Sequence, residues 1–213
     1  MKSRNLFLFR RVAFSLVELL VVVGIIVLII SLLIPAFRGI SGGIQLTTAA
    51  SSVVAELNLT RQTALSESQE VELRFYKLPD ANGQEPAFRT MQRYRVSDDQ
   101  PLGKITHIPP PIVLTDMEKF STLLSSFNGG AVPKTQNTLQ GMSNVPYRSV
   151  RFRASGATSL DPLGANGGAD RWFLSVVNQN DLRTATAESA KPCNNFITIQ
   201  IDPVTGRTRT FQP

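Results

Sequence analysis

One long apolar run near the N-terminus dominates the pattern of the chain. Between Phe14 and Ile34 there are 21 residues, and only one of them, Glu18, is charged. As an α-helix this run would be about 31 Å long, close to the roughly 30 Å hydrocarbon core of a bilayer. The pattern therefore predicts a transmembrane helix over residues 14–34. Pro35 follows directly and is expected to kink the helix.

The spacing of apolar residues becomes helical after this run. They recur every three or four positions between Ile44 and Leu65, with Leu46, Val53 and Leu57 among them. This spacing predicts an amphipathic helix that continues the first one over residues 35–68. Its apolar side is expected to pack on a globular domain.

The rest of the chain, residues 69–213, carries alternating patterns typical of β-strands. A first pair of strands is expected from Val71 and over 88–96, joined as a hairpin across the turn-rich segment 79–86. A short helix is expected over 116–127, with Asp116 as its cap, followed by a long loop over 128–144. Further strands are expected over 149–153, 172–177, 196–201 and 207–211, the last two joined by a short turn. The fold class is α+β.

Positive charge is concentrated before the apolar run. The formal net charge is +6, and Lys2, Arg4, Arg10 and Arg11 supply four of these charges. The residues after Ala13 hold 18 Lys and Arg against 16 Asp and Glu, too small an excess for a nucleic-acid-binding surface. No nucleic-acid partner is therefore expected.

The same basic residues predict the topology. Basic residues flanking a membrane helix stay in the cytoplasm, and only Arg38 follows the run closely. The chain is expected to be a single-pass protein of the cytoplasmic (inner) membrane with its N-terminus in the cytoplasm. Its C-terminal domain is expected in the periplasm or outside the cell.

A cleaved secretory signal peptide fits this N-terminus poorly. Such a peptide has an apolar region of about 7–15 residues followed by a small residue at the cleavage site. Here the run is longer, and the small residue Ala13 precedes it. An uncleaved signal anchor fits the topology, but it does not explain Glu18.

Glu18 needs a positive partner if it lies in a membrane. A carboxylate at the centre of a membrane helix costs about 2.5–3.5 kcal/mol on insertion scales, and less near one end. Cleavage between Ala13 and Phe14 would create an α-amino group one helical turn before Glu18. In an assembly, the amino group of an incoming subunit could pair with Glu18 of its neighbour.

The segment from Arg10 to Leu20, RRVAFSLVELL, resembles the class III signal of type IV prepilins and type II secretion pseudopilins. The resemblance implies cleavage between Ala13 and Phe14 by prepilin peptidase, followed by N-methylation of Phe14. It also implies that Glu18 guides docking to other pilin-like subunits and that Pro35 is the helix-kink proline. This chain has Ala13 where the family usually has glycine before the cut.

The C-terminal third resembles a second part of the same family. The segments FRASGATS, WFLSVV and FITIQIDPVTGRTRTF are similar to the C-terminal domain of minor pseudopilins of the H type. This resemblance implies a small antiparallel, β-sandwich-like domain at residues 69–213, packed on the N-terminal helix. The overall layout is also similar to that of the Verru_Chthon cassette protein D group of prepilin-like proteins, which implies no activity.

The sequence carries no strong sign of enzymatic chemistry. His107 is the only histidine and Cys193 the only cysteine, so a multi-His or Cys-rich metal site is not expected. The segment from Asp161 to Asp170 offers oxygen ligands in a Gly-rich loop but lacks EF-hand spacing, so a plain loop is the preferred interpretation. We expect no catalytic residues, no cofactor and no metal.

Two classes of function remain open. In the first, the chain is a structural subunit, a minor pilin or pseudopilin, in a type IV pilus or type II secretion-like filament. In the second, it is a stand-alone membrane-anchored binding module or enzyme that uses the prepilin signal only for export. The lack of a recognisable catalytic motif favours the first class.

Overall fold

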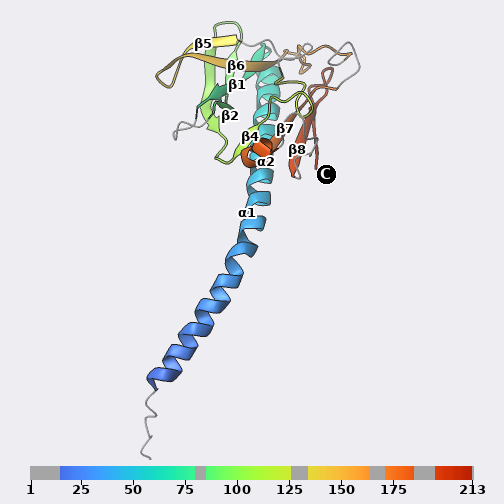
Figure 1. Ribbon diagram of the computed structural model, residues 1–213. Helices are drawn as coiled ribbons and strands as arrows, with labels where there is room; N and C mark the ends of the chain where they lie inside the picture. The colour runs from blue at the N-terminus through green and yellow to red at the C-terminus, as the bar shows by residue number, and fades with distance from the viewer. Residues whose placement is uncertain (1–14, 80–84, 126–133, 164–170, 185–194, 213) are drawn as a thin grey trace, which may run out of the picture. The chain divides into compact units, whose positions relative to one another are not determined.

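A computed structural model of the chain describes residues 15–79, 85–125, 134–163, 171–184 and 195–212, without the side chains of residues 32–41. The chain divides into two compact units, Met1–Ser41 and Gly42–Pro213. Helix α1, Leu16–Glu67, contributes residues to both units (Figure 1).

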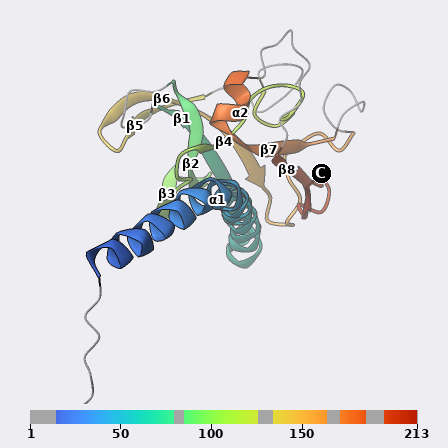
Figure 2. The ribbon, with the colours of Figure 1, turned by 60° about the horizontal axis from the view of Figure 1, so that its bottom comes forward.

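The larger unit contains one antiparallel sheet. Among the described residues its strands follow the order β5-β6-β1-β2-β4-β7-β8-β9, and β3 pairs with β2 off this path. Figures 1 and 2 show β5 and β6 toward one end of the sheet and β8 toward the other. The elements after α1 are β1 Val71–Leu78, β2 Ala87–Arg95, β3 Gln100–His107, β4 Ile112–Leu114, β5 Lys134–Leu139, β6 Met142–Phe152, β7 Phe173–Asn178, α2 Gln179–Thr184, β8 Phe196–Ile201 and β9 Thr208–Phe211.

One face of the C-terminal part of α1 forms one side of the core. Leu46, Ala50, Val53, Leu57 and Ala64 are each at most 3% exposed and join one apolar cluster with residues of β1, β6, β7 and β8. Burying a Leu-sized side chain stabilises a fold by about 1.5–3 kcal/mol, so this stripe holds the helix on the sheet. The packing that the apolar spacing predicts is confirmed for this segment.

Two polar clamps fix the same part of the helix to the sheet. Glu56 pairs with Arg93 of β2, with 3.3 Å between oxygen and nitrogen. Arg61 donates from Nε to the backbone carbonyl of Thr205 at 2.9 Å and to that of Gly156 at 3.3 Å. The helix is therefore tied to β2 on one side and to the turn between β8 and β9 on the other.

The strand pairs expected at both ends of residues 69–213 are confirmed. β1 and β2 pair antiparallel from Val71 opposite Arg95 onward. β8 and β9 pair from Thr198 opposite Phe211 to Ile201 opposite Thr208.

The helix predicted over 116–127 is wrong for residues 116–125, which form turns. The amides of Phe120 and Ser121 donate to the carbonyl of Met117, both at 2.9 Å, but the backbone after them bonds to another element. The amides of Thr122 and Leu123 both donate to the carbonyl of Phe173 in β7, at 3.0 Å. Asp116 is not a helix cap, because its carboxylate pairs with Lys77 at 2.7 Å.

The loop predicted over 128–144 is wrong from residue 134 onward. Residues 134–139 form β5, and β6 begins at Met142. Gln140 and Gly141 both have positive φ, at 50° and 81°, which is the geometry of a two-residue hairpin turn. The strand pattern is hidden in the sequence because β5 is largely exposed and polar on both faces.

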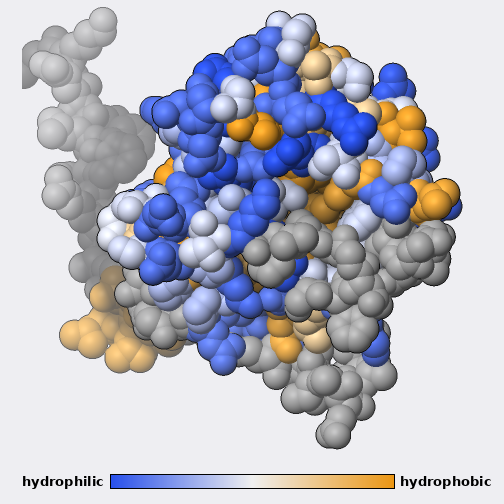
Figure 3. All heavy atoms as spheres, turned by 90° about the horizontal axis from the view of Figure 1, so that it is seen from above, coloured by the Kyte–Doolittle hydropathy of each residue, from blue (hydrophilic) through white to orange (hydrophobic). Residues whose placement is uncertain are grey.

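The sheet also differs from the expected sandwich. β4 pairs with β2 at Phe88 opposite Leu114 and with β7 along its length, so the described strands form one continuous sheet. The sequence patterns do not predict β3, β4 or α2. Over the larger unit, the face seen in Figure 3 is mostly hydrophilic.

Candidate functional site: the N-terminal apolar helix

The first turn of α1 is set by Ser15. Its hydroxyl oxygen accepts a hydrogen bond from the amide of Val17 at 3.2 Å, and its carbonyl accepts one from the amide of Leu19 at 3.1 Å. A serine in this position satisfies amide groups that a helix leaves unpaired at its start. The helix therefore begins at Leu16, directly after this capping residue.

The apolar side chains of the next four turns are uncovered. Every large apolar side chain from Leu16 to Ile30 is between 45% and 79% exposed. They surround the helix on all sides, whereas a helix of a soluble domain has one apolar stripe and one polar face. In water each such side chain forgoes about 1.5–3 kcal/mol of burial free energy, so this helix requires an apolar environment from outside the chain.

Glu18 is the acidic residue of the first turn of α1, and it is exposed. Among the described residues it has no ion-pair partner. A carboxylate at this end of a helix is stabilised by the helix dipole, typically by about 0.3–1 kcal/mol. That local effect accounts for the tolerance of a charge at this position, but it leaves the carboxylate open to a partner from another chain.

The structure describes less of the other predicted site residues. Ala13 and Phe14 lie outside the described residues, and Pro35 lies in α1 where side chains are not described. The cleavage site, the methylation of Phe14 and the kink at Pro35 therefore stay predictions. Within the described residues, no helix has an apolar stretch long enough to cross a membrane.

His107 takes part in local hydrogen bonding. Its Nδ1 lies 3.1 Å from the hydroxyl of Thr90, and its Nε2 lies 3.4 Å from the side-chain amide nitrogen of Gln140. In the described part of the chain, no group of three or more His, Cys, Asp and Glu residues is placed to hold a metal ion. Asp161 is described, but Asp170 lies outside the described residues.

A buried polar cluster that the sequence patterns do not predict lies on the sheet face opposite α1. Arg74 pairs with Glu72, 2% exposed, at 2.5 Å and also with Asp99. Its guanidinium lies 3.8 Å from the ring centroid of Tyr94 and 4.7 Å from that of Tyr147. Placed between two rings and two carboxylates, Arg74 holds the β2–β3 turn against β1.

Electrostatics of this cluster are governed by burial and by the arginine. Burial acts to lower the pKa of Arg74, but the hydrogen bond to Asp99 and the charge of Glu72 outweigh it and raise that pKa. Burial, together with hydrogen bonding to Tyr94, raises the pKa of the Tyr76 hydroxyl. Tyr76 donates to the side-chain oxygen of Gln136 in β5 at 2.5 Å. The cluster therefore fastens the β5–β6 hairpin to the sheet, which is a structural task.

Comparison with known proteins gives a match among solved structures alone. No protein-family model matches the chain, and no curated protein matches it. The crystal structure of the type IV minor pilin FimU from Pseudomonas aeruginosa (strain PAO1) is similar, with a TM-score of 0.46 and 12% sequence identity over 79% of this chain and 92% of that chain. A similarity this low carries no inference about fold or function.

Proposed function

We propose that this chain is a prepilin-like structural subunit, a minor pilin or pseudopilin. Prepilin peptidase removes its basic leader, and the mature chain enters a type IV pilus or a type II secretion-like filament. The observation that supports this most strongly is the exposed apolar helix after Ser15, with a single carboxylate in its first turn.

Exposure of the apolar side chains supports a membrane stage. Residues as large as Leu16 and Leu20 are 79% and 66% exposed, which lipid tails or the helices of other subunits would cover. The cytoplasmic membrane provides that cover before assembly, with the leader in the cytoplasm and the larger unit exported. Inside the filament, neighbouring apolar helices replace the lipid.

Glu18 is proposed to serve filament assembly, a role that a simple membrane anchor would not need. Removal of the leader after Ala13 leaves the α-amino group of Phe14 positively charged. In a low-dielectric environment, attraction between that group and Glu18 of a neighbour is several times stronger than in water. An unpaired carboxylate is strongly unfavourable there, so an arrangement of neighbouring helices that leaves Glu18 without its partner amino group is also disfavoured.

The decisive experiment replaces the carboxylate in cells that have the native prepilin peptidase. Glu18→Ala and Glu18→Gln are expected to insert into the membrane normally and to be absent from the sheared filament fraction. Glu118→Gln is a matched control, because Glu118 is exposed in the larger unit and its replacement removes the same charge. It should assemble like the unmodified chain. Normal filament entry of both Glu18 variants would contradict the docking role and favour a stand-alone anchored protein.

Processing is tested separately by mass spectrometry of the mature N-terminus. The expected terminus is an N-methylated Phe14. Ala13→Leu should block the cut, because a bulky side chain replaces a small one at the cleaved bond, whereas Ala13→Gly should preserve it. An intact Met1 in cells with active peptidase would refute processing at this site.

The alternative function is a stand-alone membrane-anchored binding module or enzyme that uses the signal only for export. It requires the anchor but not the carboxylate. Under that alternative, Glu18→Ala leaves all activity of the exported unit unchanged and no filament contains the chain.

A further inference from the structure

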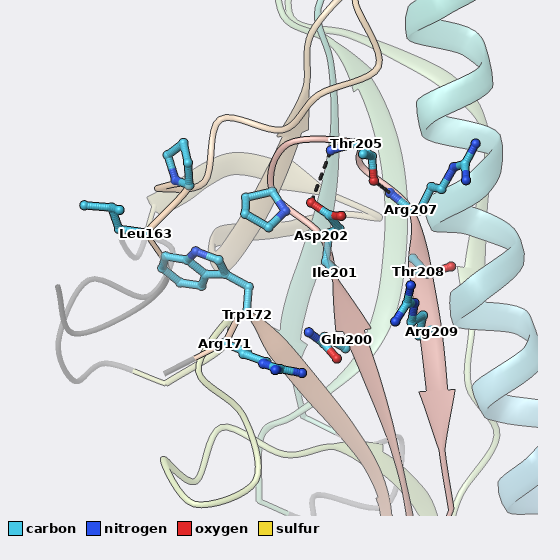
Figure 4. Close-up of a pocket in the computed structure, with 12 residues that line it drawn as sticks. Leu163, Arg171, Trp172, Gln200, Ile201, Asp202, Thr205, Arg207, Thr208 and Arg209 are labelled. Carbon is cyan, nitrogen blue, oxygen red and sulfur yellow. Dashed lines mark hydrogen bonds between the residues drawn. The ribbon is translucent and has the colours of Figure 1, made fainter. Parts of the chain in front are cut away.

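A hollow of about 660 Å³ lies on the outer face of the last three strands (Figure 4). β8 pairs with β7 on one side and with β9 on the other. The end of β8, the start of β9 and the turn between them form its floor, and Pro162 and Leu163 form part of its rim. Its size falls within the roughly 300–1,000 Å³ that is usual for small-molecule sites.

Strand register explains why polar side chains gather there. Ile199 and Ile201 of β8 are fully buried, so Gln200 between them points to the opposite, outer face. Gln200 stands opposite Phe173 in β7 and opposite Arg209 in β9. Arg171 lies two residues before Phe173, the first residue of β7. Figure 4 shows the side chains of Arg171, Gln200 and Arg209 close to one another.

Charges on this face are unbalanced. Arg171, Arg207 and Arg209 all line the hollow and are exposed, and none has an ion-pair partner among the described residues. Asp202 is the acidic residue that lines it. Its Oδ1 already accepts hydrogen bonds from the amides of Val204 and Thr205, at 2.9 and 3.2 Å.

Asp202 therefore belongs to the turn. Burial acts to raise its pKa, but the backbone hydrogen bonds and the charge of Arg209 outweigh this and lower it, so the carboxylate is ionised at neutral pH. With three guanidinium groups and one carboxylate, the hollow keeps a net positive charge.

Trp172 makes the site rigid. Its ring is only 3% exposed, and its Nε1 donates to the carbonyl of Asp161 at 2.9 Å. The backbone on which Arg171 stands is also held, because the amide of Ile201 donates to the carbonyl of Trp172 at 2.9 Å. The arginine side chains thus extend from fixed strand positions, and the ordering of a mobile loop is not required.

We propose that this hollow binds a small ligand with two oxyanionic groups, either carboxylates or phosphates. Arg171 and Arg209 each hold one group, and the amide of Gln200 donates between them. Guanidinium groups bind both kinds of oxyanion through paired N–H donors. β7 and β9 flank β8, and Arg171 lies two residues before the position opposite Gln200, so the two arginine backbones are about 12 Å apart. Two long guanidinium side chains can reach across this distance to two charged groups on one small molecule. A long polyanion is disfavoured, because 18 Lys and Arg against 16 Asp and Glu after Ala13 give no extended basic surface.

The test uses fluorescence of Trp172, the only tryptophan in the chain. The full-length protein, in non-ionic detergent micelles at low ionic strength, is titrated with citrate in one arm and pyrophosphate in the other. Sodium chloride at matched ionic strength is the blank. We expect a saturable change with at least one probe, and the probe that binds more tightly distinguishes carboxylate from phosphate ligands.

The variant R171Q/R209Q is expected to weaken this binding at least tenfold. The matched control R153Q/K104Q removes the same charge from two exposed residues outside the hollow and should change the affinity less than twofold. Q200E serves as a second variant that keeps both arginines and adds a repelling carboxylate, and it should also abolish binding. The proposal is overturned by an absence of saturable binding, by equal weakening in the two double variants, or by binding of heparin or polyglutamate alone.

Discussion

Among the turn glycines that the structure describes, Gly206 is the one whose replacement by alanine is predicted to destabilise the larger unit most. Gly206 lies in the β8–β9 turn with φ of 65°, which residues other than glycine rarely adopt. A Cβ placed on it would stand 2.2 Å from the backbone oxygen of Gly156 and 3.2 Å from carbons of Arg61 and Phe152. The closest of these atoms is backbone, so side-chain rotation cannot relieve the overlap.

The expected loss is about 3–5 kcal/mol. The left-handed conformation alone costs an alanine about 1–2 kcal/mol. Relief of the overlap must move the turn away from Gly156, and overpacking of this kind costs about 1–3 kcal/mol. The same movement weakens the hydrogen bonds from Arg61 to Gly156 and Thr205. A hydrogen bond from a charged group contributes about 1.5–3 kcal/mol, of which part is lost.

Gly141→Ala is the control that separates the two effects. Gly141 has φ of 81°, but no atom lies within 4 Å of the position that a Cβ would take there, so only the backbone conformation is penalised. The assay is urea unfolding in micelles, followed by fluorescence of Trp172. Gly206→Ala should be less stable than Gly141→Ala by about 2 kcal/mol or more, because only Gly206→Ala causes the overlap and weakens the hydrogen bonds of Arg61. Equal losses in the two variants would refute the close approach to Gly156 as the cause.

Three further outcomes are expected. Arg74→Met should lower the free energy of unfolding by about 3 kcal/mol, because it leaves the buried carboxylate of Glu72 without its main partner, as thermal unfolding would show. Burial raises the pKa of Tyr76 above the usual 10.0, so its contribution to stability should be complete below pH 10 and decline above it, and Tyr76→Phe should flatten that decline between about pH 10 and 11. Glu56→Gln breaks a half-buried helix–sheet ion pair and should destabilise more than Glu67→Gln at an exposed pair, by about 1 kcal/mol in urea unfolding.

The local spacing of apolar residues predicted the secondary structure correctly where one face of an element is buried. β8 occupies residues 196–201 as predicted, and its alternate residues Ile197, Ile199 and Ile201 are at most 4% exposed. The stripe from Leu46 to Ala64 behaves in the same way with helical spacing. In both segments a single partner surface determines which side chains are apolar, so the period is visible in the sequence.

Pattern failed where tertiary contacts decide the structure. β5 has a polar sequence because its backbone pairs only with β6 and both of its faces are largely exposed to solvent. Residues 116–125 contain helix-compatible residues, but bonds to the carbonyl of Phe173 hold them as turns. Phe173 lies 51 positions after Thr122, too far along the sequence to influence the local pattern.

The two candidate sites differ in the same respect. Glu18 can be proposed from the sequence because the argument depends on residues beside it, an apolar run and the Ala13–Phe14 boundary. Arg171, just before β7, and Arg209 of β9 are 38 positions apart, and only the register of β7, β8 and β9 brings them to one face. The alternation of Arg207 and Arg209 was the available signal in the sequence, and two arginines at alternate positions are common near any exposed strand.

The location of the core determines how the Glu18 experiment is interpreted. The buried cluster of the larger unit takes its helical members from Leu46 onward, and none of its described members precedes Gly42. The clamps at Glu56 and Arg61 are likewise inside this unit. A change at Glu18 therefore removes no contact on which the fold of the larger unit depends. Absence of Glu18→Gln from filaments, with unchanged unfolding monitored at Trp172, would locate the defect in docking between subunits and not in folding.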